Sequence, residues 1–178
     1  ASGGVGMAAV DVGKLLGATV IATGGSDAKL QRVLRYGADH VINNKQGFRE
    51  QVKALTAGRG ADVVYDPVGG DIFDESTRCI NFDGRLLIIG FASGRIASVA
   101  TNIPLIKGFS VMGVRAGEYG RQFAEKGAEN LLTIWDWVRE GKTRPHVHAE
   151  LPLSQSVEGF RMLQQREVIG KLVICPDR

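Results

Sequence analysis

The stretch ASGGVG, which runs from Ala1 to Gly6, decides the fold because it has the spacing of a dinucleotide-binding turn. Such a turn uses glycines for a tight bend, for close approach of the backbone to a pyrophosphate, and for close packing of helix on strand. Ala1 occupies the first position of the pattern, and Gly3 and Gly6 occupy the second and third. The pyrophosphate would meet N–H groups at the positive end of the following helix. The pattern is specific only in the right structural context.

The sequence after this turn supplies that context, because helical and β-branched segments alternate. The spacing of Met7, Val10 and Leu15 predicts a helix that ends at Gly17, and the β-branched run Ala18–Thr23 is typical of a buried strand. Further helices are expected over residues 26–37, 47–58, 71–80 and 121–141, and further strands over residues 40–43, 61–70, 84–94 and 109–114. This alternation predicts an α/β fold of the Rossmann type, with a doubly wound parallel sheet.

Two shorter features refine this prediction. The apolar runs Val63–Tyr65 and Leu86–Ile89 predict central strands that are buried on both faces. After Lys142 the pattern changes to an extended segment, a helix capped by Ser154, and a final strand over residues 168–175. This tail is expected to form either a sheet edge or part of a different unit.

No strand precedes the glycine turn in the sequence, which begins at Ala1. In a doubly wound sheet that strand is the central one. Its loss would leave the edges of two neighbouring strands unpaired. We therefore expect either that residues upstream of Ala1 are missing or that another segment fills the gap.

Composition excludes several classes of function. The 178 residues are 44% hydrophobic and 23% charged, with no apolar run long enough to cross a bilayer and no signal-peptide pattern at the start. We therefore expect a cytoplasmic protein with no membrane partner, in which Cys79 and Cys175 are reduced core residues. The net charge of +3 is compatible with a phosphate-bearing ligand, but basic and acidic residues are interleaved, so no nucleic-acid partner is expected.

Two histidines raise the question of a metal site. His146 and His148 would share one face of a strand, but two ligands do not make a zinc site, and Cys175 is the nearest following cysteine. We interpret both as exposed polar residues of a strand, and no metal is expected.

The end of the second strand favours NADP over NAD. Proteins that bind NAD typically place Asp or Glu about 20 residues beyond the glycine turn, where it holds the ribose hydroxyls. That place is filled by Thr23, Gly24 and Gly25, so no carboxylate would repel a 2′-phosphate. Ser26 and Lys29 follow and could bind the phosphate by charge-assisted hydrogen bonds. The alternative is that Ser26 only caps a helix and Lys29 is a solvated surface residue.

Four ordered motifs carry a family resemblance: ASGGVG, VVYDPVGGDIFDES, DGRLLIIGFASG and VIGKLVI. Together they resemble the medium-chain dehydrogenase/reductase superfamily, and within it the zinc-independent, zeta-crystallin-like quinone oxidoreductases. In that branch an alanine at the position of Ala1 is usual. The resemblance implies an oxidoreductase that uses NADP(H) to reduce a small-molecule electron acceptor, either a quinone or an activated alkene or carbonyl.

The resemblance also implies a domain organisation. Residues 1–142 would form the dinucleotide-binding domain without its first strand, and residues 143–178 would be the return segment of a GroES-like catalytic domain. Much of the substrate pocket would come from that catalytic domain, so no catalytic residue is assigned. The edge strand Phe109–Val114 would pair two subunits into a homodimer.

Carried over by position, the resemblance implies cofactor contacts from four segments. The contacts are Gly3, Gly4, Val5 and Gly6 at the pyrophosphate; Gly24, Ser26, Lys29 and Asn44 at the 2′-phosphate; Asp66 and Val68 beside the nucleotide; and Gly90, Phe91 and Ala92 at the nicotinamide ribose. Many members have a tyrosine where this chain has Asn44, which weakens the phosphate assignment. Phe91 has an alternative role as a core aromatic residue.

Two functions remain open from the sequence. The first is an NADPH-dependent oxidoreductase of the quinone reductase type, represented by its nucleotide-binding portion. The second is a truncated, catalytically silent nucleotide-binding or interaction module. They differ in what precedes Ala1.

Overall fold

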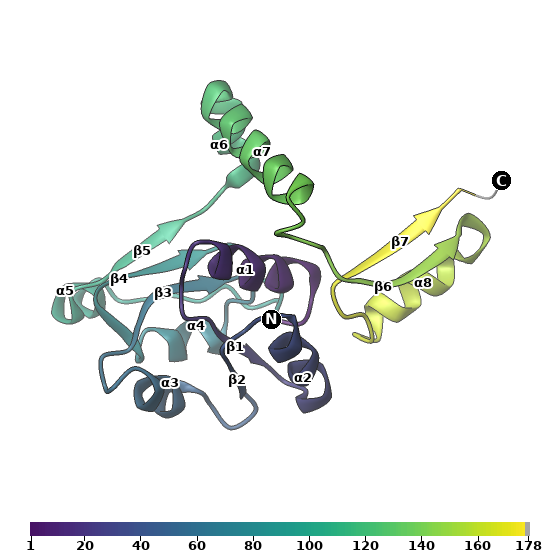
Figure 1. Cartoon of the computed structure of the whole chain (residues 1–178). Coiled ribbons are helices and arrows are strands. Elements are labelled where there is room, and N and C mark those ends of the chain that lie inside the picture. Colours follow the sequence, from purple (N-terminus) through teal and green to yellow (C-terminus); the bar gives the residue numbers. More distant parts are fainter. Residues whose placement is uncertain (177–178) are drawn as a thin grey trace. The chain divides into compact units, whose positions relative to one another are not determined.

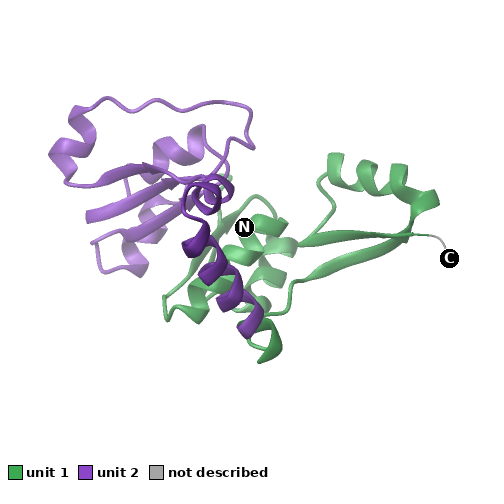
Figure 2. Ribbon diagram, turned by 90° about the horizontal axis from the view of Figure 1, so that it is seen from above, with its two compact units in different colours: residues 1–45, 137–178 green, residues 46–136 purple. Residues whose placement is uncertain are grey.

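The computed structural model describes residues 1–176 and divides the chain into two compact units (Figures 1 and 2). Unit 1 joins Ala1–Lys45 to Trp137–Arg178, and unit 2 is Gln46–Asp136. All the paired strands are parallel, in the orders β1-β2, β3-β4-β5 and β6-β7. The predicted α/β fold with parallel sheets is therefore confirmed. The predicted domain boundary between residues 142 and 143 stays a prediction.

Unit 1 begins with two successive helix–strand pairs and ends with the tail. Its elements are α1 (Gly4–Leu15), β1 (Ile21–Gly24), α2 (Asp27–Tyr36), β2 (His40–Asn43), β6 (Val147–Pro152), the 3-10 turn η1 (Leu153–Gln155), α8 (Ser156–Gln164) and β7 (Lys171–Cys175). Its core contains Met7 and Val10 from α1, Ala22 from β1 and Val33 from α2. These positions recur at helical spacing on α1, so one face of the helix is buried.

The predicted helix ends are confirmed, and so is the cap position of Ser26, whereas the predicted cap at Ser154 is wrong. Gly17 and Gly37 follow α1 and α2 with φ of 79° and 131°, a region that favours glycine. Ser26 occupies the N-cap position of α2, but its side chain makes no capping hydrogen bond. Ser154 lies in η1, and α8 begins only at Ser156, because a 3-10 turn precedes the helix.

The tail meets the glycine turn through the backbone. Gly170 N donates a hydrogen bond to Ser2 O at 2.8 Å, and Gly3 and Gly170 form a parallel bridge. Ile169 packs against the core cluster of unit 1. The segment before β7 therefore lies beside the turn.

Unit 2 contains a three-stranded sheet with helices. Its elements are α3 (Arg49–Leu55), β3 (Ala61–Asp66), α4 (Asp71–Ser76), β4 (Ile80–Ile88), α5 (Asn102–Lys107), β5 (Ser110–Gly113), α6 (Ala116–Gln122) and most of α7 (Ala124–Arg139). Phe73, Ile80, Leu86 and Phe109 form its core. Leu86 is completely buried, as predicted for β4.

The predicted burial of β3 on both faces is wrong. Val63 and Tyr65 are 42% and 43% exposed, whereas Val64 between them packs against the core cluster. Successive side chains of a strand point to opposite faces, so β3 buries one face and exposes the other.

The helix predicted over residues 121–141 is also divided. Phe123 has non-helical angles, φ −126° and ψ 72°, and separates α6 from α7. A Cβ on Gly127 would lie 2.8 Å from the Cα of Gly120, so only glycines let the two helices approach this closely. The predicted end at Gly141, with φ 67°, is confirmed.

Candidate dinucleotide site

The glycine turn opens directly into α1, as the sequence pattern predicts. Gly3 is the N-cap residue, with φ −79° and ψ 171°, and has no side chain to cap the helix. The first turn contains no acidic residue, and Met7 N donates to Gly3 O at 2.9 Å. The first N–H groups of a helix have no intrahelical acceptor, and here no side chain at Gly3 competes for them. The start of α1 is therefore suited to an anion.

The residues of this turn have different surroundings. A Cβ added to Gly3 would have no heavy atom within 4 Å, whereas a Cβ on Gly6 would meet the backbone of Ala1. Val5 is half-exposed in the first turn of α1. A Cβ on Gly4 would lie 2.9 Å from Cδ and 3.0 Å from Nζ of Lys171.

Lys171 is a candidate functional residue to which the sequence analysis gave no role. Its side chain reaches Gly4 because β7 begins beside the turn, where Lys171 N donates to His146 O at 2.9 Å. Its positive charge adds to the positive end of the helix dipole. The signal in the sequence was the motif VIGKLVI, whose lysine could not be placed without the fold.

The predicted phosphate residues gather at the end of β1. Gly24 ends that strand, and Asn44 N donates to Gly24 O at 3.0 Å. Asp27 is the nearby acid of α2, and its Oδ1 accepts a hydrogen bond from Asn43 Nδ2 at 2.8 Å. Ser26 precedes α2, and its side chain is not used as a cap. The structure therefore brings Gly24, Ser26 and Asn44 to one end of the β1-β2 sheet.

The side chain of Lys29 forms hydrogen bonds in the same region. Its Nζ donates to Val168 O at 3.3 Å and also to the carbonyl oxygen of Arg166. The alternative of a freely solvated lysine is therefore wrong. Arg166, with φ 57°, is brought next to Lys29 by the tail, and no pattern in the sequence connects the two residues.

The remaining predicted residues lie in unit 2, at the carboxyl ends of β3 and β4. Asp66 is buried, and its Oδ1 accepts hydrogen bonds from Val68 N at 2.8 Å and Gly69 N at 3.0 Å. This carboxylate therefore shapes the turn after β3. Ala92 N donates to Pro67 O at 3.1 Å, which joins the loop after β4 to that turn.

Gly90 and Phe91 belong to the same loop. A Cβ on Gly90 would lie 3.2 Å from Pro67 O, so the loop packs closely on the turn. Phe91 is 49% exposed, which excludes its alternative role as a core aromatic residue. Val68, Gly90, Phe91 and Ala92 thus lie together at the carboxyl ends of β3 and β4, next to the buried Asp66.

Neither a metal-ligand cluster nor a membrane-spanning helix is found among residues 1–176. Within residues 1–176, no group of three or more His, Cys, Asp and Glu side chains could hold a metal ion. His148 Nδ1 accepts a hydrogen bond from Ile169 N at 3.4 Å. Among the helices of the described chain, none has the length and apolar character needed to span a membrane. The cytoplasmic location stays a prediction.

Comparison with known proteins places this geometry in context. Residues 4–132 match the family model described as zinc-binding dehydrogenase. The "quinone oxidoreductase-like protein 2" of Bos taurus is 37% identical over 176 residues, which is 98% of this chain and 50% of that relative. The "2-haloacrylate reductase" of Burkholderia sp is 31% identical over 183 residues, covering 99% of this chain and 54% of that protein.

The fold agrees with a solved structure. The Escherichia coli quinone oxidoreductase complexed with NADPH is 30% identical and superimposes with a TM-score of 0.83, over 98% of this chain and 55% of that chain. The chain thus spans about half the length of the relatives that it matches.

Proposed function

Because the chain belongs to the medium-chain dehydrogenase/reductase superfamily, in its quinone oxidoreductase branch, we propose that it is the nucleotide-binding portion of an NADPH-dependent oxidoreductase. The observation that carries the proposal is the start of α1, where Gly3 leaves open space and Lys171 lies against Gly4. Helix N–H groups and one ammonium are the donors that a pyrophosphate requires.

The choice of NADPH rests on the end of β1. No carboxylate stands at Thr23, Gly24 or Gly25, and Lys29 supplies a cation whose present partners are backbone carbonyl oxygens. A 2′-phosphate would be a stronger acceptor for that ammonium than a neutral carbonyl group. The match to a quinone oxidoreductase solved with NADPH supports this choice.

The acceptor is proposed from the relatives. Their names refer to a quinone and to a 2-haloacrylate, which is an activated alkene. Both can take up a hydride and a proton in a two-electron reduction. When bound, the dinucleotide would supply the hydride, and the loop Gly90–Ala92 would bind its nicotinamide half. We assign no proton donor, and the GroES-like catalytic domain remains part of the proposal.

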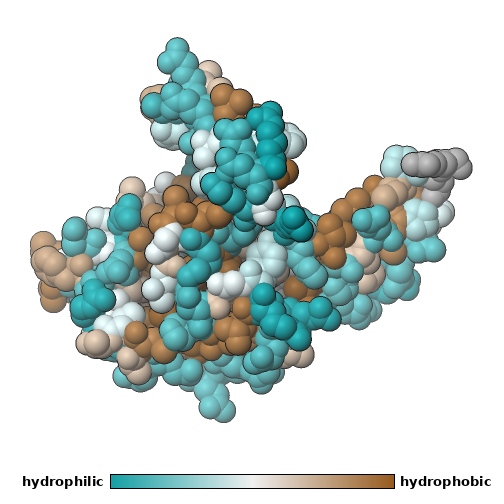
Figure 3. Space-filling view, viewed as in Figure 1, coloured by the Kyte–Doolittle hydropathy of each residue, from teal (hydrophilic) through white to brown (hydrophobic). Residues whose placement is uncertain are grey.

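The tail has a surface that fits this organisation. Leu153, Val157, Phe160 and Leu163 are exposed apolar residues along η1 and α8. Figure 3 shows further apolar side chains exposed on the tail. We propose that residues 143–178 are the return segment of the catalytic domain, which would cover this apolar surface. An apolar face of this kind is typical of a surface that packs on a partner.

A thermal-shift experiment tests the cofactor. NADPH should raise the melting temperature more than NADH at equal concentration, because a ligand stabilises according to its affinity. Lys29→Ala should remove most of the difference between the two nucleotides. Arg35→Ala, which removes an exposed cation from the other end of α2, should preserve it. Equal shifts with both nucleotides in the unmodified chain would contradict the choice of NADPH.

The catalytically silent nucleotide-binding module is the second candidate function. A turnover assay distinguishes the silent module from the enzyme. Oxidation of NADPH in the presence of a quinone, followed by absorbance, would establish the enzyme, and binding without turnover by the natural full-length polypeptide would establish the silent module.

We also propose a homodimer through the edge strand. Within the described residues β5 pairs only with β4, so its outer edge is open. Leu105 and Ile106, which precede it in α5, are 82% and 74% exposed. The double variant Leu105→Asp, Ile106→Asp should halve the mass measured by light scattering, while Leu16→Asp at an equally exposed site should not. A monomeric unmodified chain would contradict the dimer.

A further inference from the structure

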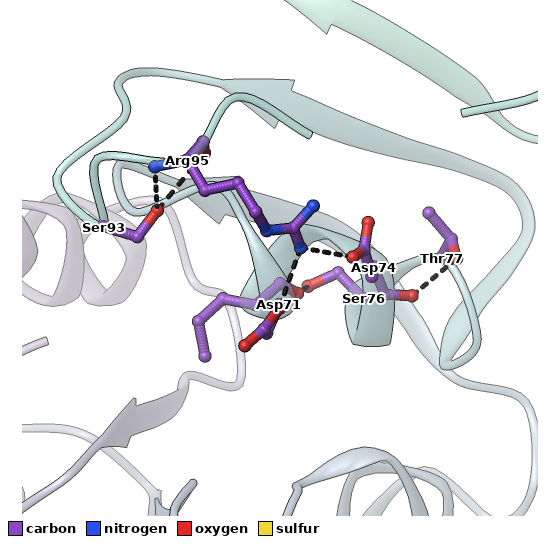
Figure 4. A network of polar contacts seen from close by, with 7 residues as sticks. Asp71, Asp74, Ser76, Thr77, Ser93 and Arg95 are labelled. Atoms are coloured by element: carbon purple, nitrogen blue, oxygen red, sulfur yellow. Dashed lines mark hydrogen bonds and ion pairs between the residues drawn. The ribbon is translucent and has the colours of Figure 1, made fainter. Parts of the chain in front are cut away.

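Arg95 links the loop after β4 to α4. Its Nη2 lies 2.8 Å from Asp71 Oδ1 and also contacts Asp74 Oδ2 (Figure 4). Both acids come from α4, one turn apart, and Figure 4 shows the guanidinium reaching across to them from the loop. Arg95 N also donates to Ser93 Oγ at 3.2 Å. The loop therefore closes on itself and is held by one cation that two carboxylates share.

The same loop contacts the β3–α4 turn through its backbone. Ala92 N donates to Pro67 O at 3.1 Å, and Ser93 N donates to Val68 O at 3.0 Å. The approach is close because the turn contains glycine: a Cβ on Gly70 would lie 2.8 Å from Ser93 Oγ, and Gly70 has φ 58°. These two backbone hydrogen bonds, the close packing of the loop on Gly69 and Gly70, and the Arg95 ion pairs hold the loop in place.

We infer that Arg95 is a positioning residue, which holds the loop 90–95 on the β3–α4 turn and so fixes the backbone that would contact the nicotinamide half of the cofactor. The inference rests on the proposed function for its ligand. A loop that is ordered before binding removes part of the entropy cost of ordering it on binding. Among the ion pairs of the described residues, those of Arg95 join this loop to α4, so Arg95 is the side chain to change.

The contribution of the Arg95 ion pairs to holding the loop depends on how exposed Arg95 is. Arg95 is 48% exposed, and exposed ion pairs contribute little when they are isolated. One guanidinium that serves two carboxylates forms a small network, in which a single ordered side chain makes two contacts. Loss of this network should therefore raise local opening by roughly threefold to tenfold, with little effect on global unfolding.

Amide hydrogen exchange of the ligand-free chain tests the clamp itself. In Arg95→Gln the amides of Ala92 and Ser93 should exchange about fivefold faster than in the unmodified chain. Arg59→Gln is the matched control, since it removes the exposed Arg59–Asp62 pair at the other end of β3. Arg95→Lys should restore part of the protection, because an ammonium can pair with one carboxylate. Unchanged exchange in Arg95→Gln would overturn the inference.

Ligand titration tests the link to the cofactor. Arg95→Gln should weaken NADPH binding about threefold to fivefold, with no change in affinity for 2′,5′-ADP, which lacks the nicotinamide half. A general loss of structure would weaken both ligands equally and overturn the assignment. Faster exchange with unchanged NADPH affinity would overturn the link to the cofactor. If the unmodified chain binds neither ligand, the proposed function fails, whereas the exchange rates still decide whether Arg95 clamps the loop.

Discussion

A Cβ on Gly6 would lie 2.5 Å from the carbonyl oxygen of Ala1, a distance that real Cβ atoms essentially never show. The neighbouring atoms are backbone, so no flexible side chain could move aside. Gly3 is the opposite case, because a Cβ there would face open space. The two glycines therefore have different roles: Gly6 allows close packing, and Gly3 leaves space open. Replacing Gly6 should reduce stability, whereas replacing Gly3 should reduce nucleotide binding.

Replacement of Gly6 by alanine should destabilise the fold. The added methyl group forces the backbone of Ala1 away from α1, and overpacking of this kind costs about 1–3 kcal/mol. Urea denaturation followed by circular dichroism would measure the loss. A variant with unchanged free energy of unfolding would show that residues 1–3 do not pack on α1.

Gly3→Ala should leave stability unchanged but weaken nucleotide binding. The backbone angles of Gly3, φ −79° and ψ 171°, are accessible to any residue, so we expect a change in unfolding free energy within about 0.5 kcal/mol. The methyl group would occupy the space through which a pyrophosphate approaches the backbone. The NADPH-induced rise in melting temperature should therefore be reduced. An undiminished rise would place the pyrophosphate elsewhere.

Glu75 in α4 caps α3 from a distance in the sequence. Its Oε1 accepts hydrogen bonds from Phe48 N at 2.6 Å and Arg49 N at 3.0 Å. Glu75→Ala should lower the free energy of unfolding by about 1 kcal/mol, the usual effect of losing an N-cap. Glu75→Gln, which keeps an oxygen acceptor, should lose less. Glu50→Ala in the first turn of α3 is the control and should have a smaller effect than Glu75→Ala.

The sequence predicted the parts of the fold that local chemistry determines. Helix ends at Gly17, Gly37 and Gly141 follow from glycine's access to positive φ, and the alternation of elements follows from hydrophobic periodicity. The placement of Gly24 beside Asn44 follows from the parallel order of β1 and β2, whose carboxyl ends share one edge.

The rest depends on contacts between segments far apart in the chain. Lys171 reaches Gly4, and Glu75 accepts the hydrogen bond of Phe48 N, only because the fold brings these residues together. No local pattern in the sequence encodes such pairs. The exposed face of β3 was missed for a related reason: an apolar run shows which side chains could be buried, but not which faces a helix covers.

Asp39 should make stability depend on pH. Lys14 Nζ lies 2.8 Å from its carboxylate, and Val20 N donates to Asp39 Oδ2 at 2.7 Å. The hydrogen bond from Lys14 and that from the Val20 backbone hold the pKa of Asp39 below its ordinary value of 3.8. The native state then binds fewer protons than the unfolded state, so the stabilisation is present above pH 3.8 and is lost as the pH falls through the lowered pKa.

Asp39→Asn tests this dependence. The urea midpoint of the variant should lie below that of the unmodified chain at pH 7, and the two midpoints should converge as the pH falls below 3.8. A difference that stays constant with pH would show that the carboxylate charge is not the source of the stabilisation.

Cys79 should be unreactive in the native state. It is 1% exposed, and burial, followed by the negative charge of Glu75, raises the pKa of its thiol to about 11. The thiolate is the reactive form, so near pH 8 both access and ionisation oppose modification. Ellman's reagent should therefore react promptly with the partly exposed Cys175 alone, and with Cys79 only after unfolding. Cys175→Ser should remove the native reaction, whereas Cys79→Ala should leave it intact. Prompt reaction of the Cys175→Ser variant would mean that the segment around Cys79 opens readily, because modification of a buried thiol requires local unfolding.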